Sequence, residues 1–356
     1  MISVRDRQFE AYQAFVLGCK LHWTGRLYPA LRELYREKAA RAANAGQAPR
    51  SAEDAAALLQ DEVLHHEFAW MERHLQRFKY SGRWGLQPVH AARRAELEGE
   101  LDGALPPGLL ELDPDLAIPT YFASVDIHQH PGGIWSDPIA GYVYERGARS
   151  TTPLLARDRD LHWRFAAIVD ARRGGGRILD MGCGFGKSTR PFWSGDRAAE
   201  VIGVDIAAPC LRYAAQDAAQ AQARNVRFLQ RDCRATGLPD ASQDVVTSTM
   251  MIHEMPPPAV RATFAEARRL LAPGGVMVHL DFLPPDDPFL RFLHFGHGRR
   301  NNEPYMEPLA RMDVAGTLDE LGFRDVEILD FEEMEGAIAA TAERWRFPWK
   351  VIVARA

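Results

Sequence analysis

The sequence predicts an open α/β fold with a mostly parallel sheet, preceded by an α-helical N-terminal domain, and three features predict it. Over residues 153–356, short apolar segments rich in Val and Ile alternate with helical patterns, as in a sheet built from strand–helix–strand units. The first of these segments runs into a glycine-rich turn at residues 182–186. Residues 1–125 instead carry apolar side chains at three- and four-residue steps, which is typical of amphipathic helices.

The N-terminal domain is predicted as a set of helices over residues 1–125. Ser51 is typical of an N-cap, with Asp54 three residues on, and the pattern predicts one helix from there to about Tyr80. Glu62 and His65 have the Glu-x-x-His spacing found in dimetal bundles. A dimetal site needs a second helix with the same spacing, which the sequence does not offer, so we predict no metal here.

Residues 126–152 form a predicted pocket-forming linker, because long irregular connections in compact proteins are usually functional. The segment is dense in His, aromatic residues and Gly. The spacing Asp126-x-His128-x-His130 has three readings: a lining of a pocket, ordinary loop packing, or a set of metal ligands that lacks a third separate member. The pocket candidates are His128, His130, Trp135, Tyr142, Tyr144 and Arg146.

The glycine turn follows a predicted strand that ends at Asp180. Glycines allow a backbone to approach a ligand without interference from a Cβ atom. The dinucleotide fingerprint Gly-x-Gly-x-x-Gly fails here because its sixth position is Lys187, and the phosphate-loop spacing fails as well. Residues 187–189 are predicted to start a helix, so the turn has the strand–turn–helix context of a nucleotide-side crevice.

Two acids follow the next strands. Asp205 ends an apolar segment about 20 residues after the glycines, where a carboxylate can accept hydrogen bonds from ribose hydroxyls. Asp232 follows the third strand, then Leu238-Pro239 and Asp244-Val245-Val246, and residues 272–275 read Ala-Pro-Gly-Gly. Together with Asp-x-Gly-x-Gly-x-Gly, this series resembles the class I S-adenosylmethionine-dependent methyltransferases of the ubiquinone and menaquinone pathways. The resemblance covers residues 153–356.

The resemblance implies a Rossmann-like fold with seven strands, of which the last is antiparallel, and S-adenosylmethionine as the cofactor. It implies that Asp205 holds the ribose and that Asp232 lies beside the adenine. Asp180 is expected to act indirectly, by fixing the glycine turn or by binding the amino group. The predicted cofactor-binding residues are Asp180, Gly182, Gly184, Gly186, Asp205, Ile206, Asp232 and Cys233.

Residues for the chemistry are expected after the fourth strand. His253 and Glu254 follow it, and ligands of open α/β sheets bind beyond the carboxyl ends of the strands. His253 is predicted to take a proton from an acceptor hydroxyl or amine; the alternative is that it only holds the turn. An insertion after the fifth strand is expected to cover the acceptor, with Arg suited to binding a carboxylate. Its candidates are Arg299, Arg300, Asn301 and Tyr305.

The predicted function is transfer of a methyl group to O, S or N of a small polar metabolite that can carry a carboxylate. Two alternatives stay open: an S-adenosylmethionine-binding protein with another reaction, and a methyltransferase of protein or RNA. The net charge of −5 predicts no nucleic-acid partner. The scattered cysteines, the charged N-terminus and the lack of a long apolar run predict a cytoplasmic protein without a membrane segment. The N-terminal domain is expected to cover the substrate, to form a homodimer, or to do both.

Overall fold

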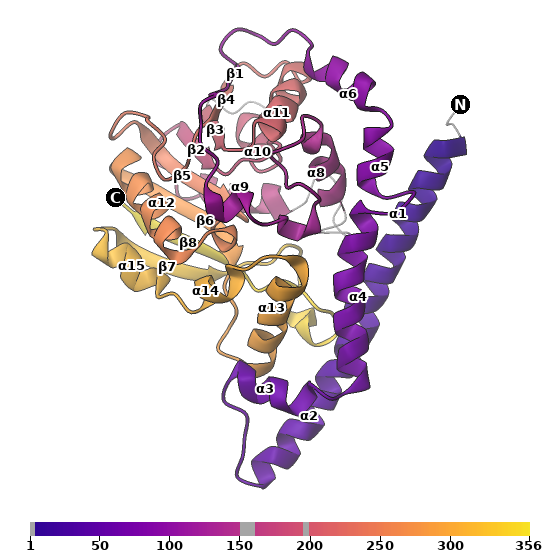
Figure 1. Ribbon diagram of the computed structural model, residues 1–356. Helices are drawn as coiled ribbons and strands as arrows, with labels where there is room; N and C mark the ends of the chain where they lie inside the picture. Colours follow the sequence, from indigo (N-terminus) through magenta and orange to yellow (C-terminus); the bar gives the residue numbers. More distant parts are fainter. Residues whose placement is uncertain (1–3, 150–160, 195–198) are drawn as a thin grey trace.

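The computed structural model describes residues 4–149, 161–194 and 199–356. Within these ranges, eight strands form one sheet in the order β1-β4-β3-β2-β5-β6-β8-β7. The first four in chain order are β1 (Leu110–Glu111), β2 (Arg177–Met181), β3 (Glu200–Asp205) and β4 (Val226–Gln230). The others are β5 (Gln243–Thr249), β6 (Leu271–Phe282), β7 (Arg324–Asp330) and β8 (Trp349–Arg355). Figure 1 shows the sheet in the upper part of the molecule.

The sheet confirms the predicted mostly parallel arrangement. Strands β1 to β6 pair in parallel, and β8 is antiparallel to both β6 and β7. One strand more than the predicted seven is present, because the two-residue β1 pairs with β4. Since β1 lies within residues 1–125, the helical prediction for that region is corrected at this point.

Helices cover both faces of the sheet (Figure 1). One face packs against α9 (Leu161–Asp170), α10 (Arg190–Trp193) and α11 (Ala208–Gln220). The other packs against α12 (Pro257–Leu270), α14 (Met306–Ala310) and α15 (Val314–Glu320). Neighbouring residues of one strand point to opposite faces, as a pleated strand requires: Ile178 belongs to the first core and Leu179 to the second.

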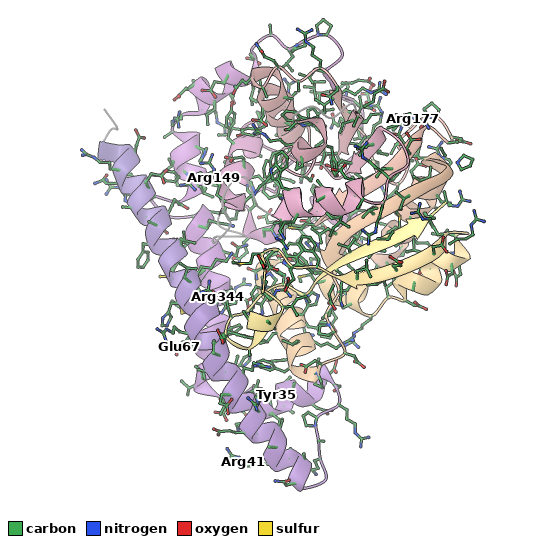
Figure 2. The ribbon with its side chains drawn as sticks, turned by 180° about the vertical axis from the view of Figure 1, so that it is seen from behind. Tyr35, Arg41, Glu67, Arg149, Arg177 and Arg344 are labelled. Carbon is green, nitrogen blue, oxygen red and sulfur yellow. The ribbon has the colours of Figure 1, made fainter. Side chains whose placement is uncertain are left out.

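The N-terminal helices form a separate layer beside the sheet. Helix α1 (Val4–His22), the π-helix η1 (Trp23–Leu27) and α2 (Tyr28–Asn44) follow one another without a break, and they form the long rod at the edge of the molecule. Figure 2 shows Arg41 near one end of this rod and Arg177 on the opposite side of the molecule. The rod packs on α4 (Val63–Tyr80) around Trp23, Tyr28 and Phe68.

Two predicted helices are each divided in the structure. Ser51 does cap a helix with Asp54 in a capping box, but that helix is α3 (Ala52–Leu59) and ends before α4. The apolar pattern also predicts one helix over residues 309–321. The structure has α14 and α15 there, because Asp313 caps a new helix by accepting from the Gly316 backbone N–H at 2.9 Å. Local capping by Asp313 therefore overrides the continuous apolar pattern between α14 and α15.

The predicted linker contains two helical elements, with the non-helical residues 130–139 between them. It contains the 3₁₀ turn η2 (Ile127–Gln129) and α8 (Ala140–Ala148). Before it come α5 (Leu86–Ala91), α6 (Arg94–Leu101) and α7 (Thr120–Ala123). Its last residues, 150–152, and the start of the predicted helix over 154–172 lie outside the described residues.

The insertion after β6 joins the two layers. It forms α13 (Pro288–Asn301), whose Phe289 and Leu293 pack in the same core as the N-terminal helices. The segment after β7, which includes η4 (Ala339–Ala342), also touches the rod: the Trp345 backbone N–H donates to the Thr24 carbonyl at 3.0 Å. The N-terminal helices are therefore held beside the carboxyl ends of the central strands.

Candidate active site

A cavity of about 220 Å³ lies between the carboxyl ends of the central strands and the N-terminal helices. Its floor comes from the turns after β2, β3, β4 and β5. Its opposite wall comes from α1, η1 and α4, with further side chains from α8, α13 and the segment before β8. The position beyond the strand ends is the usual ligand site of open α/β sheets.

The glycine turn is shaped by close approaches that exclude any side chain. Gly182 has φ +66°, and a Cβ there would lie 2.6 Å from the Met251 Sδ. Gly186 has φ +83°, and its Cβ would lie 2.9 Å from that of Ala214. Both positions therefore require glycine for backbone and for space.

Asp180 lies at the end of β2 and contacts the residues that follow the glycine turn. It is fully buried, and its Oδ2 accepts hydrogen bonds from Ser188 Oγ and Thr189 Oγ1, both at 2.7 Å. Burial raises the pKa of its carboxyl to about 6. The predicted helix start over residues 187–189 is corrected: these hydroxyl contacts hold a turn, and the helix α10 begins at Arg190.

Asp205 ties the end of β3 to the glycine turn. Its Oδ2 accepts from the Gly184 backbone N–H and its Oδ1 from the Ala207 N–H, both at 2.8 Å. Burial raises the pKa of this carboxyl to about 6. A carboxylate has about four acceptor positions, so Asp205 lines the cavity with capacity left for hydroxyl donors.

The remaining predicted cofactor residues also line the cavity, apart from Asp180 and Gly186. Asp232 is held by the Arg234 side chain and backbone N–H, with Cys233 beside it and Ile206 after Asp205. In addition, the hydroxyl of Thr249 lines the cavity and is buried without a hydrogen-bond partner among the described residues. Two carboxylates, a tight glycine turn and an unpartnered hydroxyl fit a nucleoside that brings ribose hydroxyls and polar base edges.

His253 lies in the 3₁₀ turn η3 (Ile252–Glu254), where β5 ends beside β6. Its Nδ1 lies 2.6 Å from Asp281 Oδ1, and Asp281 Oδ2 accepts from the backbone N–H groups of Met251 and Ile252. A carboxylate only accepts, so Nδ1 carries the proton and the neutral ring presents Nε2 as an acceptor. Nε2 is buried, faces the cavity wall and has no hydrogen-bond partner in the described part of the chain.

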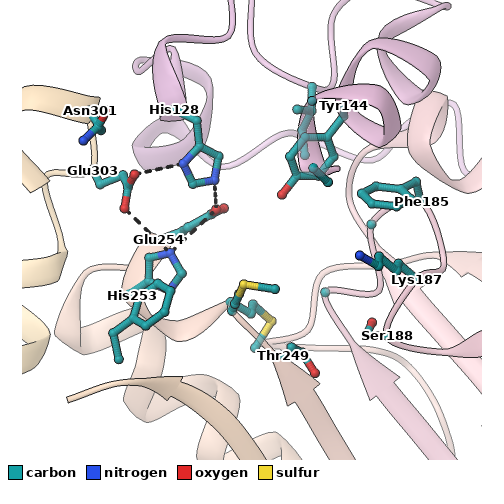
Figure 3. A pocket seen from close by; sticks show the side chains of 18 of the residues that line it. His128, Tyr144, Phe185, Lys187, Ser188, Thr249, His253, Glu254, Asn301 and Glu303 are labelled. Carbon is teal, nitrogen blue, oxygen red and sulfur yellow. Dashed lines mark hydrogen bonds and ion pairs between the residues drawn. The ribbon is translucent and has the colours of Figure 1, made fainter. Parts of the chain in front are cut away.

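A charged network surrounds this nitrogen, as Figure 3 shows. His128 contacts Glu303 through Nδ1 at 2.9 Å and Glu254 through Nε2 at 3.0 Å. The same two glutamates lie 3.9 and 4.0 Å from His253 Nε2. Burial opposes a charged His128 ring, but Glu303 and Glu254 raise its pKa to about 10. His128 has φ +57°, a conformation that costs about 1 kcal/mol outside glycine and is held here by the network.

The network continues towards the N-terminal helices. Glu303 Oε1 lies 3.7 Å from His297 Nε2, and His297 Nδ1 lies 2.6 Å from Glu72 Oε1 on α4. Arg300 forms an ion pair with the same Glu72. Burial opposes the charged His297 ring, but Glu72 and Glu303 raise its pKa to about 9.

Five of the twelve predicted substrate and catalytic residues line the cavity. His128, His253 and Glu254 belong to the network, and Tyr144 and Asn301 line the cavity. His130 is buried and stacked on Tyr80 at 4.8 Å between ring centroids, and burial lowers its pKa to about 3. Trp135 lines only a small neighbouring hollow.

The predicted carboxylate-binding arginines are corrected in position. Each one is paired with a glutamate: Arg146 with Glu10, Arg299 with Glu307 and Arg300 with Glu72. None of the three lines the cavity. Tyr142 donates to Glu100 at 2.8 Å, and Tyr305 packs edge-on against Tyr121, so these two also lie outside the cavity lining.

Among the described residues, the structure shows no set of metal ligands at either of the two candidate sites considered from the sequence, Glu62 with His65 and Asp126 with His128 and His130. Within the described ranges, no three His, Cys, Asp or Glu side chains are arranged to hold a metal ion. Glu62 pairs with Lys38 at 2.5 Å, while His65 packs against Phe292. Asp126 Oδ1 accepts from the Gly132 backbone N–H, so it is turned to its own loop.

Sequence reasoning missed Asp281 and Glu303. Asp281 sits inside an apolar strand, and a charged residue in that position was the available signal, because buried carboxylates are rare unless they have partners. Glu303 stands between the named Asn301 and Tyr305, and its partners His297, His253 and His128 are 6, 50 and 175 residues away in the chain. No spacing rule joins such residues before the fold is known.

We expect Asp281→Asn to move the pH dependence of turnover. Burial opposes a charged His253 ring, but Asp281 raises the pKa of His253 above its ordinary value. A base works unprotonated, so activity rises with pH through this pKa; losing the carboxylate shifts that rise to lower pH. The maximal kcat falls about 100-fold, because Asn no longer fixes the proton on Nδ1. Asp240→Asn, at an exposed ion pair, is the control; an unchanged pH profile in Asp281→Asn would contradict the dyad.

Comparison with known proteins gives the site a family context. Residues 178–275 match the family described as "Methyltransferase domain". A demethylmenaquinone methyltransferase of Thermus thermophilus is 35% identical over 133 residues, which are 37% of this chain and 59% of that protein. The nocamycin O-methyltransferase of Saccharothrix syringae is 35% identical over 153 residues, which are 42% of this chain and 50% of the relative. The chain thus covers less than two thirds of each.

Among solved structures, a SAM-dependent methyltransferase from Archaeoglobus fulgidus is similar to this chain with a TM-score of 0.45 and 18% identity. The alignment covers 60% of this chain and 99% of that one. The described part of this chain has no helix long and apolar enough to cross a membrane.

The segment that matches the family runs from β2 to the start of β6 and includes the glycine turn, Asp205, Asp232 and His253. The predicted resemblance is confirmed, S-adenosylmethionine is the cofactor that it supports, and residues 178–275 match a methyltransferase domain.

Proposed function

We propose that this protein transfers a methyl group from S-adenosylmethionine to an oxygen, nitrogen or sulfur atom of a small polar metabolite. The observation that carries the proposal is His253, whose Nδ1 is held by Asp281 while its unpartnered Nε2 faces the cavity. This nitrogen stands at the strand ends that also present the glycine turn. A proton acceptor and a nucleoside site therefore share one cavity.

In this proposal the chain's own residues divide the work. Bound S-adenosylmethionine supplies an electrophilic methyl group. Asp205 accepts from the ribose hydroxyls and Asp232 lies beside the adenine, flanked by Ile206 and Cys233. Asp180 keeps the glycine turn in place through Ser188 and Thr189. The N-terminal helices and α13 close the cavity, which excludes water and aligns the acceptor.

The base role favours an acceptor that loses a proton, such as a hydroxyl. The acceptor O–H donates to His253 Nε2 and its oxygen becomes nucleophilic, while the proton stays on the imidazole. Asp281 on one side, with Glu254 and Glu303 on the other, stabilises the imidazolium that results. An O-methyltransferase among the relatives supports this choice of atom. A thioether acceptor has no proton to lose, so His253 could not act as a base towards it.

The N-terminal region is proposed to cover the acceptor, because α1 and α4 supply one wall of the cavity. A homodimer is a further proposal for the same region, supported by the exposed apolar side chains Phe15, Val63 and Trp70 on these helices. Light scattering of the full chain tests it. A cytoplasmic location is proposed as well, and the four free cysteines support a reducing compartment.

The test is release of S-adenosylhomocysteine from S-adenosylmethionine in a screen of small hydroxyl-, amine- and thiol-bearing acceptors. We expect release only when both the cofactor and an acceptor are present. Consumption of S-adenosylmethionine without an acceptor, or a product that still carries the sulfonium methyl group, would favour a reaction of S-adenosylmethionine other than methyl transfer. Methylation of added protein or RNA, but of no small molecule, would overturn the acceptor class.

A further inference from the structure

Lys79 is a buried cation that the proposed chemistry does not use. It lies on α4, is 5% exposed and lines the cavity. Its ammonium nitrogen lies 4.8 Å from the centre of the Tyr80 ring. No carboxylate lies within ion-pair distance of it in the described ranges, although a buried lysine without a partner is rare. The Lys79 side chain therefore lines the cavity without a carboxylate at ion-pair distance among the described residues.

The carboxylates nearest in the network are already engaged by other cations. Glu72 is shared by Arg300 and His297, and Glu303 contacts His128. Lys20 on α1 lines the same part of the cavity and lies close enough to Lys79 for repulsion between the two charges. Two lysine side chains, Lys20 and Lys79, thus lie at the end of the cavity formed by α1 and α4.

The pKa values of both lysines lie below the ordinary value of a lysine. Burial lowers the pKa of Lys79 to about 7, with repulsion from Lys20 adding to the effect. Burial lowers the pKa of Lys20 to about 8, although Glu72 opposes the change. Both ammonium groups are destabilised as the cavity stands, and an anion bound between them would restore their charged form.

Between this end and His253, the wall of the cavity is aromatic. Phe282 lies 4.6 Å from the His253 ring, measured between centroids, and Phe347 stacks on Phe282 at 4.4 Å. Trp345 follows at 4.6 Å from Phe347, and Trp23 lies 5.1 Å from Trp345. All four line the cavity. A flat aromatic ligand can pack against such a wall in stacked or edge-on contact.

We propose that the methyl acceptor is an aromatic anion, whose ring packs along Phe282, Phe347 and Trp345 and whose carboxylate or phosphate binds Lys79 and Lys20. This inference rests on the proposed function and adds the acceptor's class to it. The acceptor's nucleophilic group then lies at the His253 end and its anionic group at the α1 and α4 end. The anion site comes from two helices that precede the matched domain, so that domain alone does not contain it.

The test uses matched probes on the full chain saturated with S-adenosylhomocysteine. Calorimetry compares 2-naphthoate, 2-naphthyl phosphate and the neutral 2-naphthamide on the wild type, Lys79→Met and Lys79→Arg. Lys38→Met, at a surface ion pair with Glu62, is the control for loss of a lysine. Lys20→Met is a second variant at the same site, in case Lys79→Met does not fold by circular dichroism.

We expect the wild type to bind one of the two anions at least about tenfold more tightly than the amide, as a charge-assisted contact provides. The tighter anion identifies the group as carboxylate or phosphate. Lys79→Met should bring the anion and the amide to similar affinities, whereas Lys79→Arg and Lys38→Met keep the preference. S-adenosylhomocysteine affinity should stay unchanged in all variants.

Equal binding of anion and amide by the wild type would overturn the inference, as would a preference that survives in both Lys79→Met and Lys20→Met. Absence of binding of all three probes to a protein that does bind S-adenosylhomocysteine would overturn it too. A folded wild type that binds no S-adenosylhomocysteine contradicts the proposed function instead. The two failures are therefore distinguishable.

Discussion

Replacing His253 with alanine should lower kcat about 100- to 10,000-fold, the range that a positioned general base contributes. The acceptor used is the one with the highest turnover in the S-adenosylhomocysteine-release screen. The affinity for S-adenosylmethionine should change little, because Nε2 faces the acceptor part of the cavity among Glu254 and Glu303. The measurement is steady-state kinetics together with calorimetry of the cofactor.

The control for this substitution is His66→Ala, which removes an exposed histidine from the outer side of α4 and should leave kcat unchanged. A second variant, His253→Gln, keeps a polar side chain that can contact Asp281 but cannot take up a proton. If His253 only held the turn, His253→Gln would retain most of the activity. Turnover of either His253 variant within about threefold of the wild type would contradict the base role.

Glu303→Gln should destabilise the protein by about 3 kcal/mol, because it leaves buried charges without their partner. Glu303 is 3% exposed and lies within 4 Å of His128, His253 and His297. Urea unfolding at neutral pH measures the effect. Glu307→Gln is the matched control: this glutamate pairs with Arg299 and Arg311 at the surface, where an ion pair is worth about 0–1 kcal/mol.

The pH dependence of the free energy of unfolding shows whether Glu303 stabilises the protein through its charge or through packing. The pKa of His128 is about 10 in the folded protein, above its ordinary value. Its contribution is therefore present below pH 6.5 and is lost as the pH rises through about 10. Lys20 and Lys79, with lowered pKa values, act in the opposite direction, so the difference between wild type and Glu303→Gln is the quantity to follow. That difference should shrink from pH 7 to pH 10; a constant difference would contradict the network.

The fold was predictable where local signals and burial agree. Strand β3 ends at Asp205 as predicted, and the glycine turn is where Gly182, Gly184 and Gly186 placed it, because glycine spacing reports a backbone requirement directly. The division between α3 and α4 and the edge strand β1 were missed. The first depends on where the chain leaves the helix after about two turns, and the second on pairing with β4 far along the chain.

The site was predictable on the cofactor side and only partly on the acceptor side. Asp205 and Asp232 follow strands at positions that topology brings to one edge. The arginines were predicted from their chemistry alone, and the structure pairs each with a glutamate that lies elsewhere in the sequence. Lys79 carries no motif; its position in the cavity follows from the packing of α4 on α1 and α13.

The most direct measurement is calorimetric titration of S-adenosylmethionine into the wild type and into Asp205→Ala. Asp205→Asn keeps one oxygen, which can accept from either the Gly184 or the Ala207 N–H but not from both, so it disturbs the turn less than alanine and is measured beside it. The account predicts micromolar binding by the wild type and a loss of about tenfold to a thousandfold in Asp205→Ala. No binding by a folded wild type, or undiminished binding by a folded Asp205→Ala, would contradict it.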